Sequence, residues 1–278
     1  MSSEPAVRNL LQGARAYLSG PMDFVASRAH EKKFGWRNRV SEFLGHCGVT
    51  VFDPWHKPAV RGMRAYGEED IKTIEVREQW TFAPGAKGAA ARARCAATFG
   101  ETVHIDLRMV DISDFVIAYC PTNIYSVGTP HEIIVATQQH KPVLFVSPPV
   151  HFPTLHRLEE HAGNDPKLRE LVEALKTEIP IRENPRGIPS LWYMPIVGGE
   201  NFFDGFGFAA YRERFGWETD HTIGRELDNP PVRPLLPFLE TLTRGKYPQR
   251  WSRRDEDFKP DDDWLLLEDV LEVGQQAE

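Results

Sequence analysis

The segment at residues 126–132, SVGTPHE, combines residue types that could do chemistry at one point of the chain. It joins a loop at the end of an expected strand to the start of an expected helix, where backbone N–H groups point outward and favour anions. The same residues also fit a capping box, in which Thr129 and Glu132 cap the helix and Pro130 takes its first position. The spacing alone leaves both an anion site and a helix cap open.

Asp106 and Tyr17 are further candidates for chemistry. In a helix, Asp106 has Val103, Met109 and Val110 as neighbours, so its carboxylate lies at the edge of an apolar face. A carboxylate there needs a partner or a function, unless its side chain reaches solvent or caps a neighbouring element. Tyr17 falls in an expected strand, where it is either plain sheet core or a buried hydroxyl that needs a hydrogen-bond partner.

Strands and helices that alternate along the first half of the chain must position these residues. Short apolar runs predict strands, and longer segments with apolar residues at helical spacing predict helices. The expected strands cover residues 15–19, 49–54, 114–120 and 141–146, and the expected helices cover residues 24–47, 101–113 and 129–140. This alternation predicts an α/β fold, a parallel sheet covered by helices with ligands at the carboxyl ends of its strands.

The rest of the chain predicts additions to a sheet domain at residues 15–147. Residues 1–14 form an N-terminal extension. Residues 56–99 are rich in Arg, Gly and Ala, without a sustained apolar period, and predict a long insertion. Residues 148–250 form a C-terminal elaboration. Residues 251–278 form a charged tail with one possible short helix capped by aspartates.

Within the C-terminal elaboration the pattern of elements is weaker. We expect a helix near residues 165–178 and a strand near residues 191–196. The aromatic and glycine-rich segment at residues 198–217 is either a packed aromatic turn or a surface for another subunit.

Composition, charge and motifs exclude several classes of protein. The chain has 33 Lys and Arg residues and 40 Asp and Glu residues, so its formal net charge is 33 − 40 = −7. This negative charge argues against nonspecific binding to nucleic acid or to an anionic membrane. The three cysteines include no C-x-x-C pair, so neither a disulfide framework nor a structural zinc site is expected. No phosphate-loop, dinucleotide or zinc-helix motif occurs, so we expect no metal and no cofactor. No run of 18 apolar residues occurs, and we expect a cytoplasmic protein.

Four motifs together resemble the nucleoside 2-deoxyribosyltransferase superfamily. They are AYLSGPM at residues 16–22, HIDL at 104–107, DFVIAY at 114–119 and SVGTPHE at 126–132, and their order and spacing also match. The resemblance covers residues 15–147, about half of the chain. It implies a flavodoxin-like parallel sheet with helices on both faces, and an enzyme that cleaves the N-glycosidic bond between a base and deoxyribose or ribose.

The resemblance also implies roles for individual residues. Glu132 matches the family's nucleophile, Tyr17 the tyrosine that holds it, and Asp106 an aspartate that works at the base. A carboxylate that attacks the anomeric carbon gives a covalent glycosyl intermediate, and Glu132 must be ionised for this step. Asp106 could protonate or hydrogen-bond the departing base. The expected substrate-binding residues are Ser126, Gly128, Gly20, Pro21 and Asp114.

Ser126 bears on both the substrate and the reaction. Transferases that act on free nucleosides usually have an acidic residue at this position, whereas the related nucleotide N-hydrolases have a serine that helps to hold a 5′-phosphate. The resemblance therefore favours a nucleoside 5′-monophosphate as substrate, and hydrolysis over base transfer. A loop serine that only bonds its own backbone is the alternative. Because the family often completes its site across a subunit interface, we expect a homo-oligomer.

Two other functions stay open. The sequence GTPHE at residues 128–132 also resembles an element of the lysine-decarboxylase-like phosphoribohydrolases, which cleave the same bond in modified-base ribonucleotides, although their preceding Pro-Gly-Gly is absent. YLSGPM also recurs in phage-associated members of the superfamily, which would fit a noncatalytic nucleotide-binding or sensing role.

Overall fold

A computed structural model of the chain describes residues 9–22, 25, 27–56, 76–178, 182–218, 221–245, 250–251 and 260–261. Its centre is a sheet of five parallel strands in the order β2-β1-β3-β4-β5. The strands are β1 Arg15–Ser19, β2 Thr50–Phe52, β3 Phe115–Tyr119, β4 Val143–Val146 and β5 Phe202–Phe203. This strand order is that of a flavodoxin-like fold, so the α/β prediction is confirmed.

Helices follow most strands of the sheet along the described chain. The α-helices are α1 Arg28–Phe34, α2 Trp36–His46, α4 Gly85–Ile112, α5 Gly128–Gln138, α6 Pro153–Ala162, α7 Pro166–Glu178, α8 Met194–Val197, α9 Arg212–Phe215, α10 His221–Asp228 and α11 Leu235–Thr243. The 3-10 helices are η1 Pro54–His56, η2 Leu191–Tyr193, η3 Gly199–Asn201 and η4 Phe208–Tyr211. Two short strands, β6 Arg250–Trp251 and β7 Pro260–Asp261, pair with each other.

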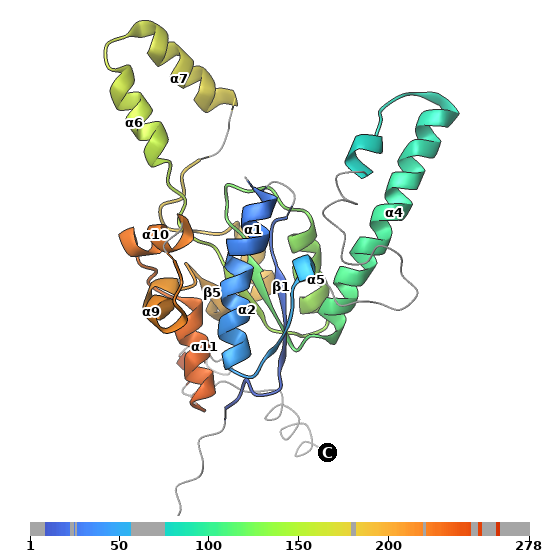
Figure 1. The fold of residues 1–278 in the computed structure, drawn as a ribbon, viewed down its shortest axis with the longest axis vertical. Helices are drawn as coiled ribbons and strands as arrows, with labels where there is room; N and C mark the ends of the chain where they lie inside the picture. The colour runs from blue at the N-terminus through green and yellow to red at the C-terminus, as the bar shows by residue number, and fades with distance from the viewer. Residues whose placement is uncertain are drawn as a thin grey trace, which may run out of the picture.

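The sheet is covered on both faces (Figure 1). On one face, α2 and α11 pack on Leu18 of β1 and Ile117 of β3. On the other face, α4 and α5 pack on Tyr17 of β1 and Val116 of β3. Because alternate residues of each strand meet different apolar layers, the strands are apolar on both sides, as expected of a buried parallel sheet.

The helix expected over residues 24–47 is two helices, α1 and α2, which meet at Gly35. The N–H of Gly35 donates to the carbonyl of Glu31, and a Cβ added to Gly35 would lie 2.3 Å from that oxygen. A side chain at this position would therefore clash, so glycine permits the sharp break between the two helices.

The helix expected over residues 101–113 begins earlier, because α4 starts at Gly85. The expected insertion at residues 56–99 thus ends inside a helix, and residues 57–75 lie outside the described part of the chain. Residues 85–99 have no apolar period, but they are rich in alanine, which has the highest intrinsic helix propensity. Propensity rather than amphipathicity accounts for this stretch of α4.

Two predictions for the C-terminal elaboration can be compared with the structure. The helix near residues 165–178 is confirmed as α7. The strand near residues 191–196 is wrong, because that segment forms η2 and α8. Pro195 has no N–H to donate to a neighbouring strand and suits the first turn of a helix, where α8 uses it. The possible helix in the charged tail lies outside the described residues.

The aromatic segment is a packed turn rather than an exposed surface. Phe203, Phe206 and Phe208 are each at most 2% exposed and belong to the core on the α2 side of the sheet. Glu226 of α10 lies beneath this turn, where its carboxylate accepts the backbone N–H groups of Phe206, Gly207 and Phe208. One buried carboxylate thus accepts hydrogen bonds from three buried backbone N–H groups that have no partner in a helix or strand.

We expect Glu226→Ala to lower the free energy of unfolding by on the order of 3 kcal/mol or more, because three buried N–H groups lose their acceptor. Urea unfolding followed by circular dichroism measures this. The exposed Glu213, replaced by Ala, is the matched control and should change stability by less than about 0.5 kcal/mol. Equal urea midpoints for Glu226→Ala and the wild type would refute this account of the turn.

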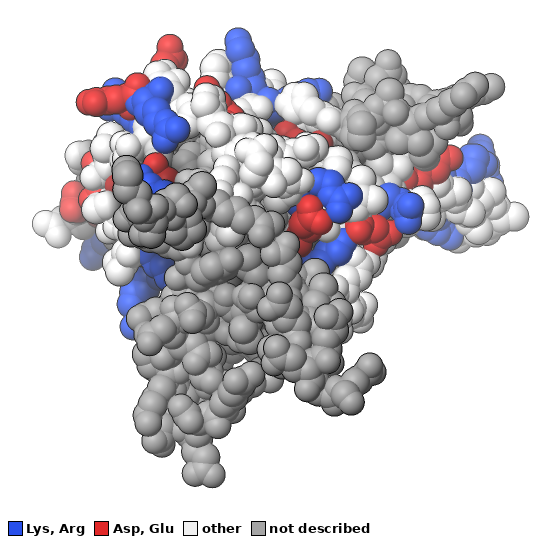
Figure 2. All heavy atoms as spheres, turned by 90° about the horizontal axis from the view of Figure 1, so that it is seen from below, with Lys and Arg blue, Asp and Glu red and all other residues white. Residues whose placement is uncertain are grey.

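The outer parts of the molecule show three features: projecting helices, mixed surface charge and the absence of a described membrane-spanning helix. In Figure 1, the α6–α7 pair and the first half of α4 stand away from the sheet. On the face drawn in Figure 2, the described Lys and Arg side chains lie among Asp and Glu side chains. Within the described ranges, the structure has no helix that is both long and apolar enough to span a bilayer.

Candidate active site

A pocket lies beside the carboxyl end of β1, where the strand order of the sheet reverses between β1 and β3. In a flavodoxin-like sheet this reversal opens a crevice that binds ligands. The pocket encloses about 260 Å³, slightly below the usual range for small-molecule sites. Its walls come from the loop after β1, η1, the middle of α4 and the first turn of α5.

Glu132 is the best-positioned carboxylate of the pocket. It is 9% exposed, and Tyr17 donates its hydroxyl to Oε1 over 2.7 Å. The hydroxyl of Ser19 donates to Oε2. Tyr17 and Ser19 are two residues apart on β1, so their side chains point to the same face of the sheet. Two buried hydroxyls therefore hold one carboxylate at the wall of the pocket.

The capping-box interpretation of residues 126–132 is wrong. Val127 is the N-cap residue of α5 and makes no side-chain cap. The hydroxyl of Thr129 pairs with that of Ser126 at 2.9 Å, and Glu132 bonds to β1 instead of the helix start. No side chain therefore caps the N-cap position, and a Cβ added at Gly128 would meet no atom within 4 Å, so the backbone there is open.

The hydroxyl of Tyr17 is strongly held in its protonated form. Burial is the largest cause that raises its pKa well above 10, and the negative charges of Glu132 and Asp106 raise it further. The positive charge of Arg37 lowers the pKa by a smaller amount. Tyr17 thus remains a hydrogen-bond donor to Glu132 throughout the physiological pH range.

We expect Tyr17 to make the protein less stable as the pH rises above 10. There the unfolded chain releases the tyrosine proton while the folded chain retains it, so stability falls by up to about 1.4 kcal/mol per pH unit. Unfolding free energies of the wild type and Tyr17→Phe between pH 9 and 11.5 measure this. The two curves should converge above pH 10, and parallel curves would refute the raised pKa.

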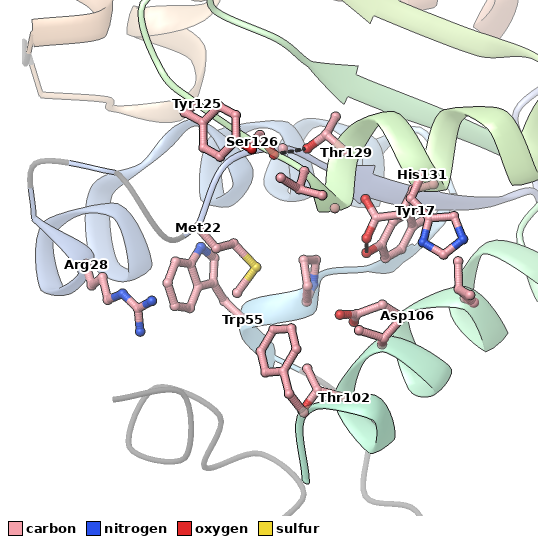
Figure 3. A pocket seen from close by; sticks show the side chains of 18 residues that line it. Tyr17, Met22, Arg28, Trp55, Thr102, Asp106, Tyr125, Ser126, Thr129 and His131 are labelled. Carbon is pink, nitrogen blue, oxygen red and sulfur yellow. Dashed lines mark hydrogen bonds between the residues drawn. The ribbon is translucent and has the colours of Figure 1, made fainter. Parts of the chain in front are cut away.

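Asp106 of α4 lies in the wall of the same pocket as Glu132. In Figure 3 its carboxylate points into the space that Tyr17 also faces. The negative charge of Asp106 also raises the pKa of Tyr17, after burial and the charge of Glu132. The sequence-predicted trio of Tyr17, Asp106 and Glu132 is therefore brought together by β1, α4 and α5.

The other end of the pocket is aromatic and partly basic. Trp55 of η1, Met22 and Arg28 face it in Figure 3. Trp55 is 5% exposed, and its indole N–H has no hydrogen-bond acceptor among the residues that the structure describes. Asp53 fixes Trp55 by accepting its backbone N–H at 2.9 Å. The flat indole can stack on a ring, and its N–H is available to an acceptor atom of a ligand.

Arg37 of α2 supports the loop that follows β1. Its fully buried guanidinium donates to the carbonyls of Gly20 at 2.7 Å, Leu18 at 3.3 Å and Pro21 at 3.4 Å. Gly20 lines the pocket, and a Cβ added there would lie 2.9 Å from the indole of Trp36. Gly20 is thus required by close packing, while Pro21 shapes the loop without lining the pocket.

Asp114 is not brought to the pocket. It precedes β3, at the amino end of the sheet. There its carboxylate accepts hydrogen bonds from the backbone N–H of Arg15 at 2.8 Å and from the guanidinium of Arg15 at 2.9 Å. The hydrogen bond from Arg15 is the main cause that lowers the pKa of Asp114. From the sequence, Asp114 is expected to bind substrate, but the structure places Asp114 at the amino end of the strands, and the pocket lies at their carboxyl end.

Sequence reasoning missed Ser19 and Trp55. Ser19 could have been found from the two-residue period of β1, which puts it on the same side as Tyr17. The position of Trp55 near the pocket could have been predicted, because Trp55 follows β2, whose carboxyl end lies next to that of β1 in the parallel sheet. The direction of its indole could not. Ser126 and Gly128, which are expected from the sequence to bind substrate, both line the pocket.

Comparisons with known proteins find a distant likeness only. No family model matches the chain, and no curated protein matches it. A solved 2-deoxyribosyltransferase from Bacillus psychrosaccharolyticus is 19% identical, with 48% of this chain and 72% of that chain covered and a TM-score of 0.26. A conserved protein from Enterococcus faecalis V583 is 16% identical, with 66% and 86% covered and a TM-score of 0.32.

Proposed function

We propose that the chain is an enzyme that cleaves the N-glycosidic bond of a nucleoside or its 5′-monophosphate, with Glu132 as nucleophile. The observation that carries the proposal is the buried Glu132 carboxylate, held by Tyr17 and Ser19 in the wall of a pocket that also contains Asp106. Two carboxylates at one pocket suit displacement at a sugar carbon. The indole of Trp55 offers a surface for the base.

In the first step, an Oε atom of Glu132 attacks the anomeric carbon and forms a glycosyl ester. The bond to the base breaks, and its electron pair moves to the base nitrogen while Asp106, in its protonated form, gives that base a proton. Tyr17 and Ser19 orient the carboxylate for this attack. In the second step, Asp106 takes a proton from water, which attacks the same carbon and releases Glu132.

The test is incubation with a panel of nucleosides and 5′-monophosphates, with and without a free acceptor base, followed by chromatography of the products. We expect free base together with sugar or sugar phosphate, because the resemblance at Ser126 favours hydrolysis over base transfer. If the added acceptor base becomes attached to the sugar, the enzyme is a transferase and not a hydrolase. If every substrate survives while it still binds, the protein is a binding or sensing module and the proposed catalysis is wrong.

We expect the 5′-monophosphate to be preferred over the nucleoside by about tenfold to a hundredfold in specificity constant. Ser126 lies in the pocket next to the uncapped start of α5, where its hydroxyl and backbone N–H groups can donate to a phosphate. Ser126→Asp places a negative charge there and should shrink the preference, whereas Ser126→Thr should keep it. Equal use of both substrates by the wild type would reject the phosphate part of the proposal.

A further inference from the structure

A second cavity, of about 410 Å³, lies at the carboxyl ends of β4 and β5 and shares no lining residue with the pocket around Glu132. Its walls are mainly apolar, with Ile188, Met194, Phe202 and Phe203 as the larger side chains. The proposed chemistry does not use this cavity, and none of the motifs at residues 16–22, 104–107, 114–119 and 126–132 lines it. A mainly apolar concavity with a few polar groups is typical of a small-molecule site.

Ser147 provides a buried polar group in this cavity. The residue is 2% exposed, and its hydroxyl has no hydrogen-bond partner in the described part of the chain. Its backbone is fixed, since its N–H donates to the carbonyl of Phe203 at 2.9 Å. Buried hydroxyls in folded proteins normally have a partner, so this one is available to a bound molecule.

Two arginines, Arg186 and Arg233, line the cavity together with Ser147. Gly187 packs directly on this strand end, because a Cβ added to it would lie 2.3 Å from the carbonyl oxygen of Ser147. That contact brings the neighbouring Arg186 to the cavity. Arg233 has its guanidinium 5.5 Å from the centre of the Phe203 ring and is paired with Glu200 at 3.0 Å.

Two positive and two negative side chains lie at or beside the cavity: Arg186, Arg233, Asp204 and Glu200. The carboxylate of Asp204 accepts the backbone N–H groups of Val232 and Arg233, and the charge of Arg233 faces Glu200. Arg186, which is exposed, forms no ion pair with any residue in the described ranges. An anionic group beside Arg186, carried on an apolar body that lies against the apolar wall, therefore suits the cavity.

We propose that this cavity binds a small organic anion, whose apolar or aromatic body packs on Phe202 and Phe203. Its carboxylate or phosphate accepts the hydroxyl of Ser147 and faces Arg186. The site is distinct from the pocket around Glu132, because the two cavities share no lining residue.

The test is ligand-observed saturation-transfer NMR titration of the full chain with three probes: benzoate, phenyl phosphate and the neutral benzamide. We expect at least one anion to bind about tenfold more tightly than benzamide, and the two anions tell a carboxylate site from a phosphate site. Arg186→Gln and Ser147→Ala should each weaken the anion by about tenfold and leave benzamide unchanged.

Two control variants assign the binding to this cavity. Arg182→Gln removes an exposed charge outside the cavity, and Glu132→Gln alters the other pocket, so neither should change the affinity for the anion. Arg186 is exposed, so its variant should fold, which circular dichroism checks. The proposal is overturned if neither anion binds, if benzamide binds equally well, or if anion binding survives both Arg186→Gln and Ser147→Ala.

Discussion

The Glu132→Gln variant is expected to lose turnover by about a thousandfold or more, while its fold and its affinity for substrate stay close to those of the wild type. Glutamine keeps the shape of the side chain but cannot attack the anomeric carbon as an anion. Tyr17 and Ser19 can still bond to the amide oxygen or nitrogen, because a hydroxyl both donates and accepts. Single-turnover rates, melting temperature and substrate affinity measure the three quantities.

Asp114→Asn is the matched control for this variant. Its carboxylate lies at the amino end of the sheet, where it pairs with Arg15 on a half-exposed surface, so its loss should cost at most about 1 kcal/mol of stability. Its turnover should match that of the wild type. If Glu132→Gln keeps its rate and lowers the melting temperature instead, the buried carboxylate has a structural role and the proposed nucleophile is wrong.

Asp106→Asn is expected to slow turnover by about 10²-fold to 10⁴-fold, the range in which a general acid contributes. The effect should depend on the leaving base. A nucleoside of 7-methylguanine carries a base that is already cationic, so it needs no proton to depart. Asp106→Asn should therefore lose much less activity with this nucleoside than with one of adenine or guanine.

The comparison of leaving bases separates acid catalysis from simple disruption of the pocket. Thr102→Ser, on the same face of α4 and in the same pocket, is the control and should lose little activity with either substrate. An equal loss by Asp106→Asn with both nucleosides would contradict a role for Asp106 in protonating the base. It would leave Asp106 as a residue that positions the substrate.

The sequence alone predicted the sheet from the apolar character of its strands, whereas the roles of the candidate site residues came from the resemblance to a family and stay predictions. Buried parallel strands are continuous apolar runs, so β1, β3 and β4 are visible in the sequence. The positions of Tyr17, Ser126 and Glu132 at strand ends and a helix start then follow from the topology. Their mutual hydrogen bonds do not, because residues 113 or more positions apart meet only through strand pairing and register.

Other features depend on tertiary contacts that no local pattern indicates. Asp114 lies in a motif that points to function, yet it serves the amino end of the sheet through Arg15. The break at Gly35 depends on the carbonyl of Glu31. The error at residues 191–196 has a local cause instead, because Pro195 disfavours a strand and suits the first turn of a helix. The extent of the insertion, the domain boundaries and self-association stay predictions.

The measurement that tests the central claim most directly is mass spectrometry of a trapped intermediate. The wild type is mixed with a 2′-fluoro nucleoside 5′-monophosphate, whose fluorine slows release of the glycosyl group by destabilising the cationic transition state, and is quenched in acid. We predict a covalent sugar phosphate on the peptide that contains Glu132, and none in Glu132→Gln. Release of free base by the wild type with no adduct on that peptide, or with an adduct at another residue, would contradict the account.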